Sequence, residues 1–573
     1  MQTRIKVLSL VFFLSFFLLV ARLFYWQVIE GKKLSAQARG QQQTGRFVKA
    51  PRGNILASDG TWLAARGEAY LVYAQLTEIK RDISEIADIL APFFVEEVNE
   101  ENYKEVLLKE ANRIKSLLSR DKVVWVPLKS KVSPEIKDNI SALNIQGIGF
   151  EYEETRVYPE ASSAAHLLGF VGKDIDGQDQ GYFGLEGYYN MVLSGKHGYV
   201  TRDSDARGIP ILLGDSKEVA ASDGVNLKIY LSKAIQLSLE KKLAEGIEKY
   251  EASSGMAIVM DPKTGGILAA VSFPSFDPLK YFNYNDEYFI NPMVSLSFEP
   301  GSIFKVVVMA SALDAGAVNP DTECDLCSGL VKIDKYSIET WNKKYRPDSN
   351  MTEVIVNSDN VGMVFVGKEL GSEMMYDYLE KFGFGKLTGI DLQGEMTPKL
   401  REKNNWSFID TATVSFGQGI AVTPIQFIQA VGAIANSGVM MKPKVVKSVM
   451  LNDWEENIKP EEVGRIISVK ASKEITAMMV EAAEYGEAKW TYLKGFNVAG
   501  KTGTAQIPIA GHYDAEKTIA SFVGFAPADD PKFVMLVILR EPKSSPWASE
   551  TAAPLWYSIA KDLFLYFNIR PKI

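Results

Sequence analysis

Strand-like runs stand at both ends of the C-terminal half of the chain, on either side of a long helical interval. Two of them, GMAIVMD and GILAAVSF, follow an amphipathic helical pattern and are joined by the hairpin signal Pro262-Lys263-Thr264-Gly265. The others, KTGTAQI, IASFVGFAP and KFVMLVILR, lie near the C-terminus. The economical arrangement is one antiparallel sheet built from both ends, with helices on its faces. We therefore expect an α+β fold whose helical layer and sheet edge meet at a cleft.

The length and charge of the chain limit what else it can be. At 573 residues it is too long for one ordinary domain, and its 46% hydrophobic and 23% charged residues are typical of globular proteins. Proteins that bind nucleic acid usually carry a basic face, whereas this chain has a net charge of -8. We therefore expect no nucleic-acid partner.

Cysteine and histidine are scarce. The chain has two cysteines, Cys324 and Cys327, and three histidines, His166, His197 and His512, none of them at metal-ligand spacing from the cysteine pair. A disulfide framework therefore cannot hold the fold together, and we expect no metal ion and no cofactor. The sequence leaves open whether these two cysteines form a local disulfide, remain free thiols, or have a redox or metal role.

An apolar run near the N-terminus predicts a membrane anchor. Residues 7–21, VLSLVFFLSFFLLVA, are apolar apart from two serines, and LFYWQVI extends the run after Arg22. About 20 residues are enough for one bilayer crossing, with Tyr25 and Trp26 as interfacial anchors. A cleaved signal peptide is the alternative, although no small-x-small site follows the run directly. Basic residues on both sides leave the orientation open.

The region after the apolar run mixes short strand-like and helical runs and shows no cluster of titratable residues. The stretch at residues 220–224 is a candidate domain boundary. We predict a tail and transmembrane anchor at residues 1–28, a structural or interaction domain at residues 29–222, called the pedestal below, and a C-terminal domain at residues 223–573.

The C-terminal domain contains three short motifs suited to acyl transfer: Ser302-Ile303-Phe304-Lys305, Ser358-Asp359-Asn360 and Lys501-Thr502-Gly503. Ser302 follows a helix-start signal, so Lys305 should share its helix face and contact its hydroxyl. A serine hydroxyl needs a base to become a nucleophile, and a lysine serves only if burial or a nearby cation lowers its pKa. We predict Ser302 as the nucleophile and Lys305 as its base.

The other two motifs supply the remaining groups. Lys501 could be the cation that lowers the pKa of Lys305, and its charge suits a substrate carboxylate. Ser358 and Asn360 alternate with Asp359 and can point into one cleft. There Ser358 would relay a proton, and Asn360 would hold Lys305 or a substrate amide.

The run KTGTAQI is expected to be a strand whose edge pairs with an extended peptide substrate. We assign Thr502, Gly503 and Thr504 to substrate binding, since Gly503 would let a peptide backbone come close. The backbone N–H groups of Ser302 and Thr504 are candidates for an oxyanion hole.

Each motif alone is a weak signal, because the chain also contains a second copy of two of them. Ser119-Arg120-Asp121-Lys122 lies in the pedestal, and Lys263-Thr264-Gly265 lies in the predicted hairpin turn. We interpret both as solvated surface. The order, spacing and context of the other motifs favour the assignment above.

The three motifs together are the set shared by class A β-lactamases and penicillin-binding proteins. The stretches FEPGSIFK, NSDNVG, SFGQGIAVTPIQ, AGKTGTAQIP and SFVGFAP closely resemble the transpeptidase domain of class B penicillin-binding proteins. Upstream, ARLFYWQVIEGKKLSAQA, PRGNILASDGTWLA, RVYPEASSAAHLLGFVG and GLEGYYN resemble the anchor and pedestal of that family. The similarity is weakest over residues 75–150, and Ala57-Ser58 stands where the family usually has Asp-Arg.

The resemblance implies a penicillin-binding and serine β-lactamase-like fold, with an antiparallel five-stranded sheet covered by helices, after a dimerisation-like pedestal. It implies D,D-transpeptidation of peptidoglycan stem peptides: Ser302 attacks the D-Ala-D-Ala carbonyl, D-Ala leaves, and a neighbouring amine resolves the acyl-enzyme. β-Lactams would acylate the same serine.

The resemblance also implies a single-pass protein of the cytoplasmic membrane, with its N-terminus inside and its catalytic domain outside. A SEDS-family glycosyltransferase and other division proteins are implied partners. The FEPGS context and FGFGKLTGIDLQGE resemble division-type members, with an elongation-type transpeptidase as the alternative.

Other functions stay open at this point. A β-lactamase would need an added base for its deacylating water, and no ExxLN-like segment lies between Asn360 and Lys501. A β-lactam sensor would need further membrane helices and an effector, neither of which is visible. A catalytically silent scaffold of the division machinery is disfavoured because all three motifs are intact.

Overall fold

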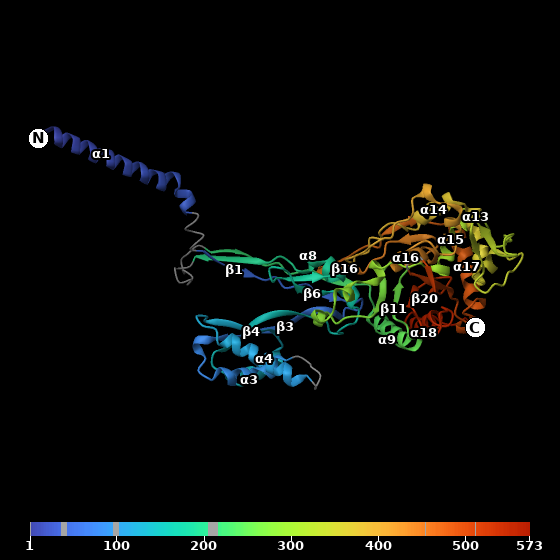
Figure 1. The fold of residues 1–573 in the computed structure, drawn as a ribbon, viewed down its shortest axis with the longest axis horizontal. Helices are drawn as coiled ribbons and strands as arrows, with labels where there is room; N and C mark the ends of the chain where they lie inside the picture. The colour runs from blue at the N-terminus through green and yellow to red at the C-terminus, as the bar shows by residue number, and fades with distance from the viewer. Residues whose placement is uncertain are drawn as a thin grey trace. The chain divides into compact units, whose positions relative to one another are not determined.

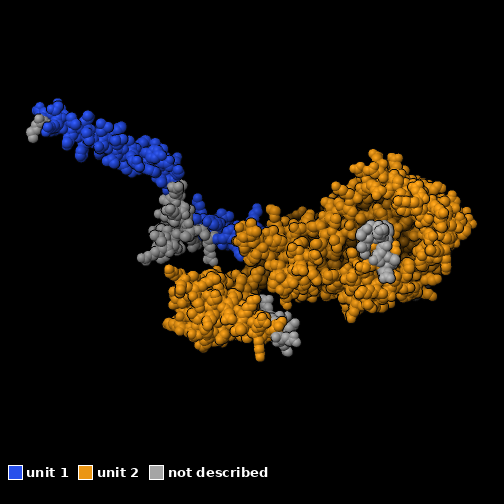
Figure 2. Space-filling view, in the orientation of Figure 1, with its two compact units in different colours: residues 1–52, 194–224 blue, residues 53–193, 225–573 orange. Residues whose placement is uncertain are grey.

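The computed structural model of the protein describes residues 2–35, 43–95, 102–203, 216–452, 454–509 and 512–572. The chain divides into two compact units, Met1–Arg52 with Ser194–Gly224 and Gly53–Leu193 with Val225–Ile573 (Figure 2). Each unit therefore combines segments that lie far apart in the sequence.

The first unit contains the predicted membrane segment and a small sheet. Helix α1 (Gln2–Phe24) continues into a π-helical turn, η1 (Tyr25–Ile29), and together they are long and apolar enough to cross a membrane. No residue of either element is buried against the chain. The sheet has the antiparallel order β1-β8-β9, made of β1 (Gln43–Val48), β8 (Gly198–Asp203) and β9 (Ser216–Val219).

Most of the pedestal folds in the second unit on a seven-stranded sheet of order β17-β16-β10-β2-β3-β4, with β5 paired to β3. Its strands are β2 (Ile55–Leu56), β3 (Trp62–Gln75), β4 (Trp125–Val132), β5 (Ile148–Val157), β10 (Asn226–Ile229), β16 (Val446–Leu451) and β17 (Trp454–Asn457). Helices α3 (Ile83–Phe94) and α4 (Tyr103–Leu118) pack against it through buried side chains such as Ile86 and Ile114.

This sheet joins the pedestal to the C-terminal domain. β10 lies just after the boundary predicted near residue 222, and it pairs in parallel with β2 and antiparallel with β16. The short elements between these strands are α5 (Pro134–Ala142), α6 (Ala165–Leu168), β6 (Phe170–Lys173), β7 (Asp179–Tyr182), α7 (Gly184–Tyr188) and α8 (Asn190–Leu193). The boundary itself stays a prediction.

A buried ion pair ties three segments of the pedestal together, and no pattern in the sequence indicates it. Arg156 Nε lies 2.6 Å from Glu186 Oε1, and the two side chains are 5% and 0% exposed. Arg156 also donates to the Gly53 carbonyl at 2.8 Å. Because a charge is costly to bury alone, each partner of this pair needs the other.

The C-terminal domain is built on the five-stranded antiparallel sheet that the sequence predicts, with the order β12-β11-β21-β20-β19; β11 and β20 are labelled in Figure 1. Its strands are β11 (Ser254–Met260), β12 (Ile267–Phe273), β19 (Ala499–Ile509), β20 (His512–Ala526) and β21 (Phe533–Arg540). Strands from both ends of the domain thus meet in one sheet, as predicted, and β19 lies at its edge.

Both faces of this sheet are covered by helices, which explains why β21 is apolar at almost every position. Leu536 and Ile538 pack in the same core as helices α11 (Lys305–Asp314), α16 (Pro424–Ala435) and α17 (Val469–Tyr485). Val537 and Leu539 face the opposite side, where α9 (Lys233–Tyr250) and α18 (Ala552–Tyr566) pack. The remaining helices are α10 (Pro292–Ser295), α12 (Met351–Val356), α13 (Asn360–Leu370), α14 (Ser372–Lys381) and α15 (Phe408–Ser415).

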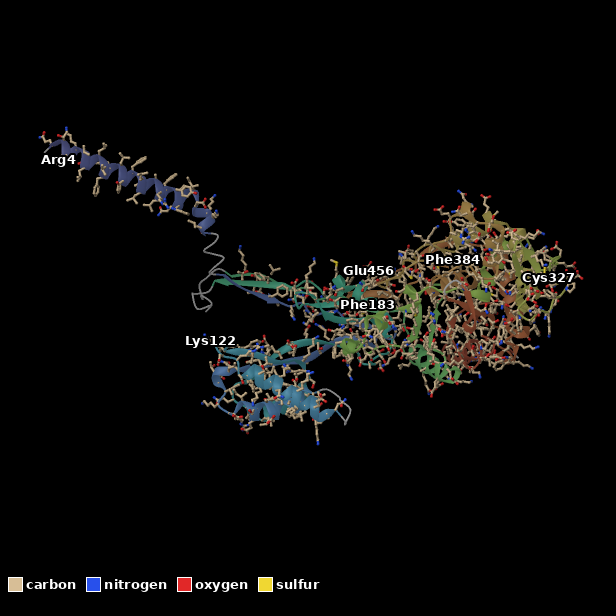
Figure 3. The ribbon with its side chains drawn as sticks, in the orientation of Figure 1. Arg4, Lys122, Phe183, Cys327, Phe384 and Glu456 are labelled. Atoms are coloured by element: carbon tan, nitrogen blue, oxygen red, sulfur yellow. A yellow bond between two sulfur atoms is a disulfide. The ribbon has the colours of Figure 1, made fainter. Side chains whose placement is uncertain are left out.

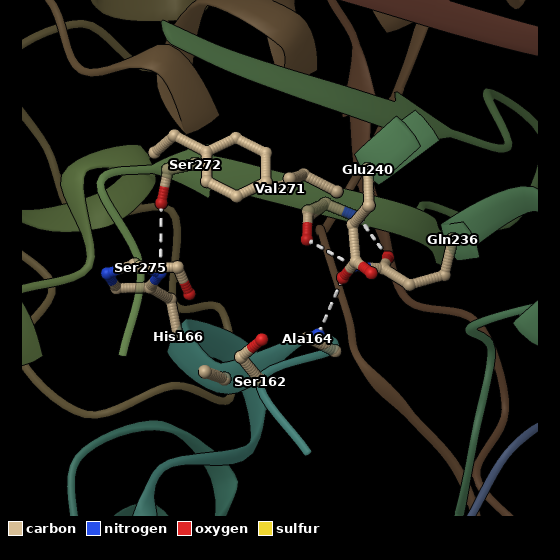
Figure 4. A pocket seen from close by; sticks show the side chains of 11 residues that line it. Ser162, Ala164, His166, Gln236, Glu240, Val271, Ser272 and Ser275 are labelled. Carbon is tan, nitrogen blue, oxygen red and sulfur yellow. Dashed lines mark hydrogen bonds between the residues drawn. The ribbon is translucent and has the colours of Figure 1, made fainter. Parts of the chain in front are cut away.

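A small polar cavity of about 40 Å³ lies where the α6 segment meets α9 and β12 (Figure 4). Glu240 of α9 accepts hydrogen bonds from the Ala164 N–H at 2.8 Å and from Ser163 Oγ at 3.1 Å. His166 contacts Ser272 Oγ and the Tyr288 carbonyl, both at 3.0 Å. Burial lowers the pKa of His166 to about 4, so this histidine is neutral near pH 7.

The cysteine pair forms a disulfide in which both residues are buried (Cys327 is labelled in Figure 3). Of the alternatives left open by the sequence, the structure therefore has the local disulfide. No group of three or more histidine, cysteine or carboxylate side chains that could hold a metal ion occurs among the described residues. The side chain of His512 lies outside the described residues.

Candidate active site

Ser302 lies in a tight 3-10 turn, η5 (Gly301–Phe304), that leads directly into α11. Gly301 has a φ of +56°, and its N–H donates to the Gly417 carbonyl at 3.0 Å. Gly417 comes so close that a Cβ atom there would lie 2.1 Å from the Gly301 carbonyl oxygen. The turn that carries Ser302 is therefore fixed by a contact between two glycines.

Lys305 is fully buried and is held by the Ser358-Asp359-Asn360 segment. Its Nζ lies 2.6 Å from the Ser358 carbonyl oxygen, 2.7 Å from Asn360 Oδ1 and 3.3 Å from Ser358 Oγ. A neutral amine has two N–H donors and one lone pair, which matches two short contacts to carbonyl oxygens and a longer one to a hydroxyl. The sequence predicts a contact from Lys305 to the Ser302 hydroxyl, but no hydrogen bond between these groups is found among the described residues.

The backbone around Ser358 is bent so that its neighbours point in different directions. Ser358 has a φ of +52°, which is unusual for a residue with a side chain. Asp359 caps α13 by accepting from the N–H groups of Val361 and Gly362. Asn360 donates through Nδ2 to the Glu339 carbonyl at 3.2 Å. Ser358 and Asn360 thus reach Lys305 while Asp359 points elsewhere, as predicted.

Lys501 approaches Ser358 from the sheet. Its Nζ lies 2.9 Å from Ser358 Oγ, 3.1 Å from the Thr502 carbonyl oxygen and 3.3 Å from Thr502 Oγ1. The Ser358 hydroxyl therefore bridges the two lysines. Ser358 can accept from a protonated Lys501 and donate to the lone pair of a neutral Lys305, which is the arrangement a proton relay needs.

The burial of the two lysines changes their proton affinities. Burial, and next the charge of Lys501, lower the pKa of Lys305 to about 7, against weaker opposing effects of Glu487 and Asp359. Burial also lowers the pKa of Lys501, and the carboxylate of Glu487 opposes that change. A lysine whose pKa is near 7 is a usable base at neutral pH.

β19 is an edge strand that packs directly on the Ser302 turn. A Cβ atom on Gly503 would lie 2.8 Å from Ile303 Cγ2 and 3.0 Å from the Ile303 backbone nitrogen. Gly503 therefore has a packing reason to lack a side chain, besides the predicted access for a peptide. Thr504 Oγ1 accepts from the Ala548 N–H at 3.0 Å.

Two tryptophans meet near the groups described above. Trp341, two residues after the carbonyl that Asn360 binds, and Trp547, next to the Ala548 that binds Thr504, have ring centroids 5.4 Å apart. They are 48% and 42% exposed. An exposed aromatic pair of this kind offers an apolar surface beside the polar groups.

The repeated motifs lie in different surroundings, as predicted. Ser119 donates to the Lys115 carbonyl at the end of α4, and Lys122 is exposed in the turn that follows (labelled in Figure 3). Lys263, in the turn between β11 and β12, pairs with Asp530 at 2.5 Å. Neither lysine is buried as Lys305 and Lys501 are.

Sequence reasoning missed the contacts of Gly417 and Glu487. Gly417 lies in the SFGQG run that contributes to the family resemblance, so that run gives a signal. Glu487 accepts a hydrogen bond from Thr502 Oγ1 at 3.0 Å, yet it lies in the run EYGEAKW, where no spacing or pattern marks it.

Comparisons with known proteins show the family of the chain. Residues 255–564 match the family described as the penicillin binding protein transpeptidase domain, and residues 47–229 match the penicillin-binding protein dimerisation domain. The chain belongs to the class B penicillin-binding proteins. This class B penicillin-binding protein is a serine D,D-transpeptidase of peptidoglycan synthesis, and its N-terminal apolar helix is long enough to cross a membrane once, which agrees with a single-pass membrane protein.

Relatives match this penicillin-binding protein over nearly its whole length. It is 32% identical to stage V sporulation protein D of Bacillus subtilis (strain 168), over 97% of its own chain and 84% of that protein. It is 30% identical to a protein of Mesostigma viride named peptidoglycan D,D-transpeptidase FtsI homolog, over 100% and 97%. Penicillin binding protein 2X from Streptococcus thermophilus has a similar crystal structure, with a TM-score of 0.74, 25% identity, and coverage of 92% and 80%. The predicted fold class is confirmed.

Proposed function

We propose that Ser302 is the nucleophile of the transpeptidase, with Lys305 as its base, Ser358 as the proton relay and Lys501 as the cation that meets the substrate carboxylate. The observation that carries this assignment is the Ser358 hydroxyl between two buried lysines, 2.9 Å from Lys501 Nζ and 3.3 Å from Lys305 Nζ. Asn360 holds Lys305 in place. The pKa of Lys305, about 7, supports its use as a base at neutral pH.

In the first half-reaction, Ser302 Oγ attacks the carbonyl carbon of the penultimate D-Ala of a stem peptide, and its proton moves to Lys305 Nζ. The backbone N–H groups of Ser302 and Thr504 stabilise the oxyanion that develops. The bond to the terminal D-Ala then breaks, and its leaving nitrogen takes a proton from Lys305 through the Ser358 hydroxyl. Hydrogen bonds of this kind often tighten only when substrate is bound, which fits the lack of a Ser302–Lys305 hydrogen bond among the described residues.

In the second half-reaction, the amine of a neighbouring stem peptide attacks the ester carbon. The proton of this amine passes to Lys305. The bond from the carbon to Ser302 Oγ then breaks, and Ser302 Oγ takes the proton from Lys305. One peptide bond is exchanged for another and D-Ala is released. The free edge of β19, with Thr502, Gly503 and Thr504, would hold the extended substrate, since an edge strand offers unpaired backbone groups.

The test of this assignment is covalent labelling. The full chain, purified in detergent, is treated with a fluorescent penicillin and compared with Ser302→Ala and Ser119→Ala by gel and intact mass. We expect one stable adduct on the parent and on Ser119→Ala, and none on Ser302→Ala. An adduct that persists in Ser302→Ala would refute the nucleophile, and rapid turnover of penicillin by the parent would favour a β-lactamase.

We further infer a role in septal wall synthesis, in partnership with a SEDS-family glycosyltransferase and other division proteins. The FEPGS context and FGFGKLTGIDLQGE support the division type over the elongation type. Depletion of the protein in growing cells should then give filaments. Round or swollen cells would favour the elongation type, and a defect only in spores would favour a role like that named for the Bacillus subtilis relative.

We infer that the anchor lies in the cytoplasmic membrane with its N-terminus inside and the catalytic domain outside. The disulfide between Cys324 and Cys327 supports a catalytic domain outside the membrane, since disulfides persist in oxidising compartments. Since both of these cysteines are buried, an exposed cysteine is introduced by Lys104→Cys, and intact cells are treated with a thiol reagent that cannot cross the membrane. Labelling of this variant in intact cells is expected, and labelling that requires lysis would contradict the orientation.

A further inference from the structure

Glu487 lies two residues after the end of α17 and is hydrogen-bonded to Thr502 of the active site. Gly486 ends the helix, and a Cβ atom there would lie 2.3 Å from the Ala482 carbonyl oxygen and 2.9 Å from that of Val356. The end of α17 thus passes close to the end of α12, two residues before Ser358. This approach carries the half-buried side chain of Glu487 to β19.

The carboxylate of Glu487 is connected to Lys501 through one hydroxyl. Thr502 Oγ1 lies 3.0 Å from Glu487 Oε2 and 3.3 Å from Lys501 Nζ. A threonine hydroxyl has a single proton, and an ionised carboxylate can only accept. The proton of Thr502 therefore points to Glu487, and the oxygen lone pairs are left for the ammonium of Lys501. The Thr502 hydroxyl thus accepts a hydrogen bond from Lys501, besides any contact that Thr502 makes to substrate.

The charged groups near the hydrogen bonds from Glu487 through Thr502 to Lys501 come from four elements. Lys501 stands on β19, Lys305 on α11 and Asp359 at the start of α13, while Glu487 follows α17. Asp359 is engaged in capping its helix. Lys501 makes no ion pair at salt-bridge distance within the part of the chain that the structure describes. Glu487 is therefore the carboxylate best placed to stabilise the charge of Lys501.

We propose that Glu487 is a positioning residue for the transpeptidase reaction: it fixes the Thr502 hydroxyl and supplies the negative charge that keeps Lys501 protonated beside a neutral Lys305. This inference rests on the assignment of Lys501 and Lys305 proposed above. Its consequence is that Lys501 stays charged, and able to bind a carboxylate, over the pH range in which Lys305 becomes neutral and able to accept a proton.

The direction of the effect follows from the charges. Burial lowers the pKa values of Lys305 and Lys501, and Glu487 raises both. Removing its charge lets both values fall further. Acylation requires a neutral Lys305, which sets the acid limb of the pH profile, and a protonated Lys501, which sets the alkaline limb. The whole profile of Glu487→Gln should therefore move to lower pH.

The experiment measures the rate of acylation by a fluorescent penicillin against pH for the full chain. Glu487→Gln keeps an oxygen acceptor for Thr502 but loses the charge, and Glu487→Asp keeps the charge. Glu484→Gln, three residues earlier in the last turn of α17, is the matched control. We expect both limbs of Glu487→Gln to move down by about one pH unit, with a roughly tenfold loss on the alkaline side. Glu487→Asp should restore most of the parent pH profile, and Glu484→Gln should have the same pH profile as the parent.

A second variant tests the route through the hydroxyl. Thr502→Val should shift the alkaline limb in the same direction, and adding Glu487→Gln to it should have less than the additive effect. Unmoved limbs in Glu487→Gln, or an equal loss at every pH, would overturn the inference. Failure of the parent itself to be labelled at Ser302 would instead refute the proposed catalytic assignment.

Discussion

The active-site lysines are held by neutral oxygen atoms, and this determines how the enzyme should respond to pH. Lys305 contacts a carbonyl, an amide and a hydroxyl oxygen, and it has no direct carboxylate partner among the described residues. Burial and the charge of Lys501 lower the pKa of Lys305 to about 7. A neutral Lys305 is therefore the minor form below this pH and the major form above it.

We predict that the acylation rate of the parent falls about tenfold for each pH unit below about 7, because the fraction of neutral Lys305 falls in that proportion. The measurement is the second-order rate of labelling by a fluorescent penicillin between about pH 5.5 and about 8. Lys305→Arg, which stays charged, should be unlabelled throughout. A flat rate across this range would show that Lys305 is not the base.

At the residue scale, the motifs were sufficient to predict most of the side chains that meet, although the predicted hydrogen bond from Lys305 to Ser302 is not found among the described residues. Four of the predicted residues converge as expected: Lys305, Ser358, Asn360 and Lys501. Each belongs to a short sequence motif in which its chemical role could be assigned. The positive φ of Ser358 and the contact of Glu487 could not be predicted. Both depend on how the ends of α12 and α17 pack against each other, and no local pattern encodes that packing.

At the scale of elements, the Ser302 turn depends on the close approach of two glycines. A Cβ atom on Gly417 would lie 2.1 Å from the Gly301 carbonyl oxygen, so the two backbones must separate if Gly417 is replaced. Since β19 also packs on this turn through Gly503, the turn has little room to move. The position of Ser302 should therefore be sensitive to a methyl group at residue 417.

We predict that Gly417→Ala lowers the acylation rate at least tenfold and destabilises the protein by about 1–3 kcal/mol, through the clash and the positive φ. Gly316→Ala is the matched control, because Gly316 also has a positive φ, +69°, but open space around it. Acylation rate and thermal unfolding are measured for both. Equal loss of acylation in the two variants would refute a specific role for the Gly301–Gly417 contact.

The strands of the five-stranded sheet could be predicted from the sequence because each is a short apolar run bounded by turn residues. The seven-stranded sheet could not. β2 and β10 are only two and four residues long, and β10 pairs with β2 and β16, which both lie far away in the chain. Pairing between such short segments is decided by the folded context and not by local pattern.

At the scale of the whole molecule, the buried pair of Arg156 and Glu186 holds segments that are distant in sequence. We predict that Glu186→Gln destabilises the protein by about 3–5 kcal/mol, because it leaves the Arg156 charge buried without its partner. The double change Arg156→Met with Glu186→Leu should cost less, since no charge is then buried. Thermal unfolding of both variants is the measurement, and a single variant as stable as the parent would contradict the prediction.

The pairing of β10 with β2 has a consequence for how this protein can be divided. A recombinant fragment that starts at residue 223 would keep β10 and β16 but lose β2, whose residues Ile55 and Leu56 face Leu227 and Lys228. The exposed strand edge is a template for aggregation. We expect such a fragment to associate in size-exclusion chromatography, whereas one that begins near Glu30 stays monodisperse. The pedestal and the catalytic domain are thus poor candidates for exchange as independent modules between relatives.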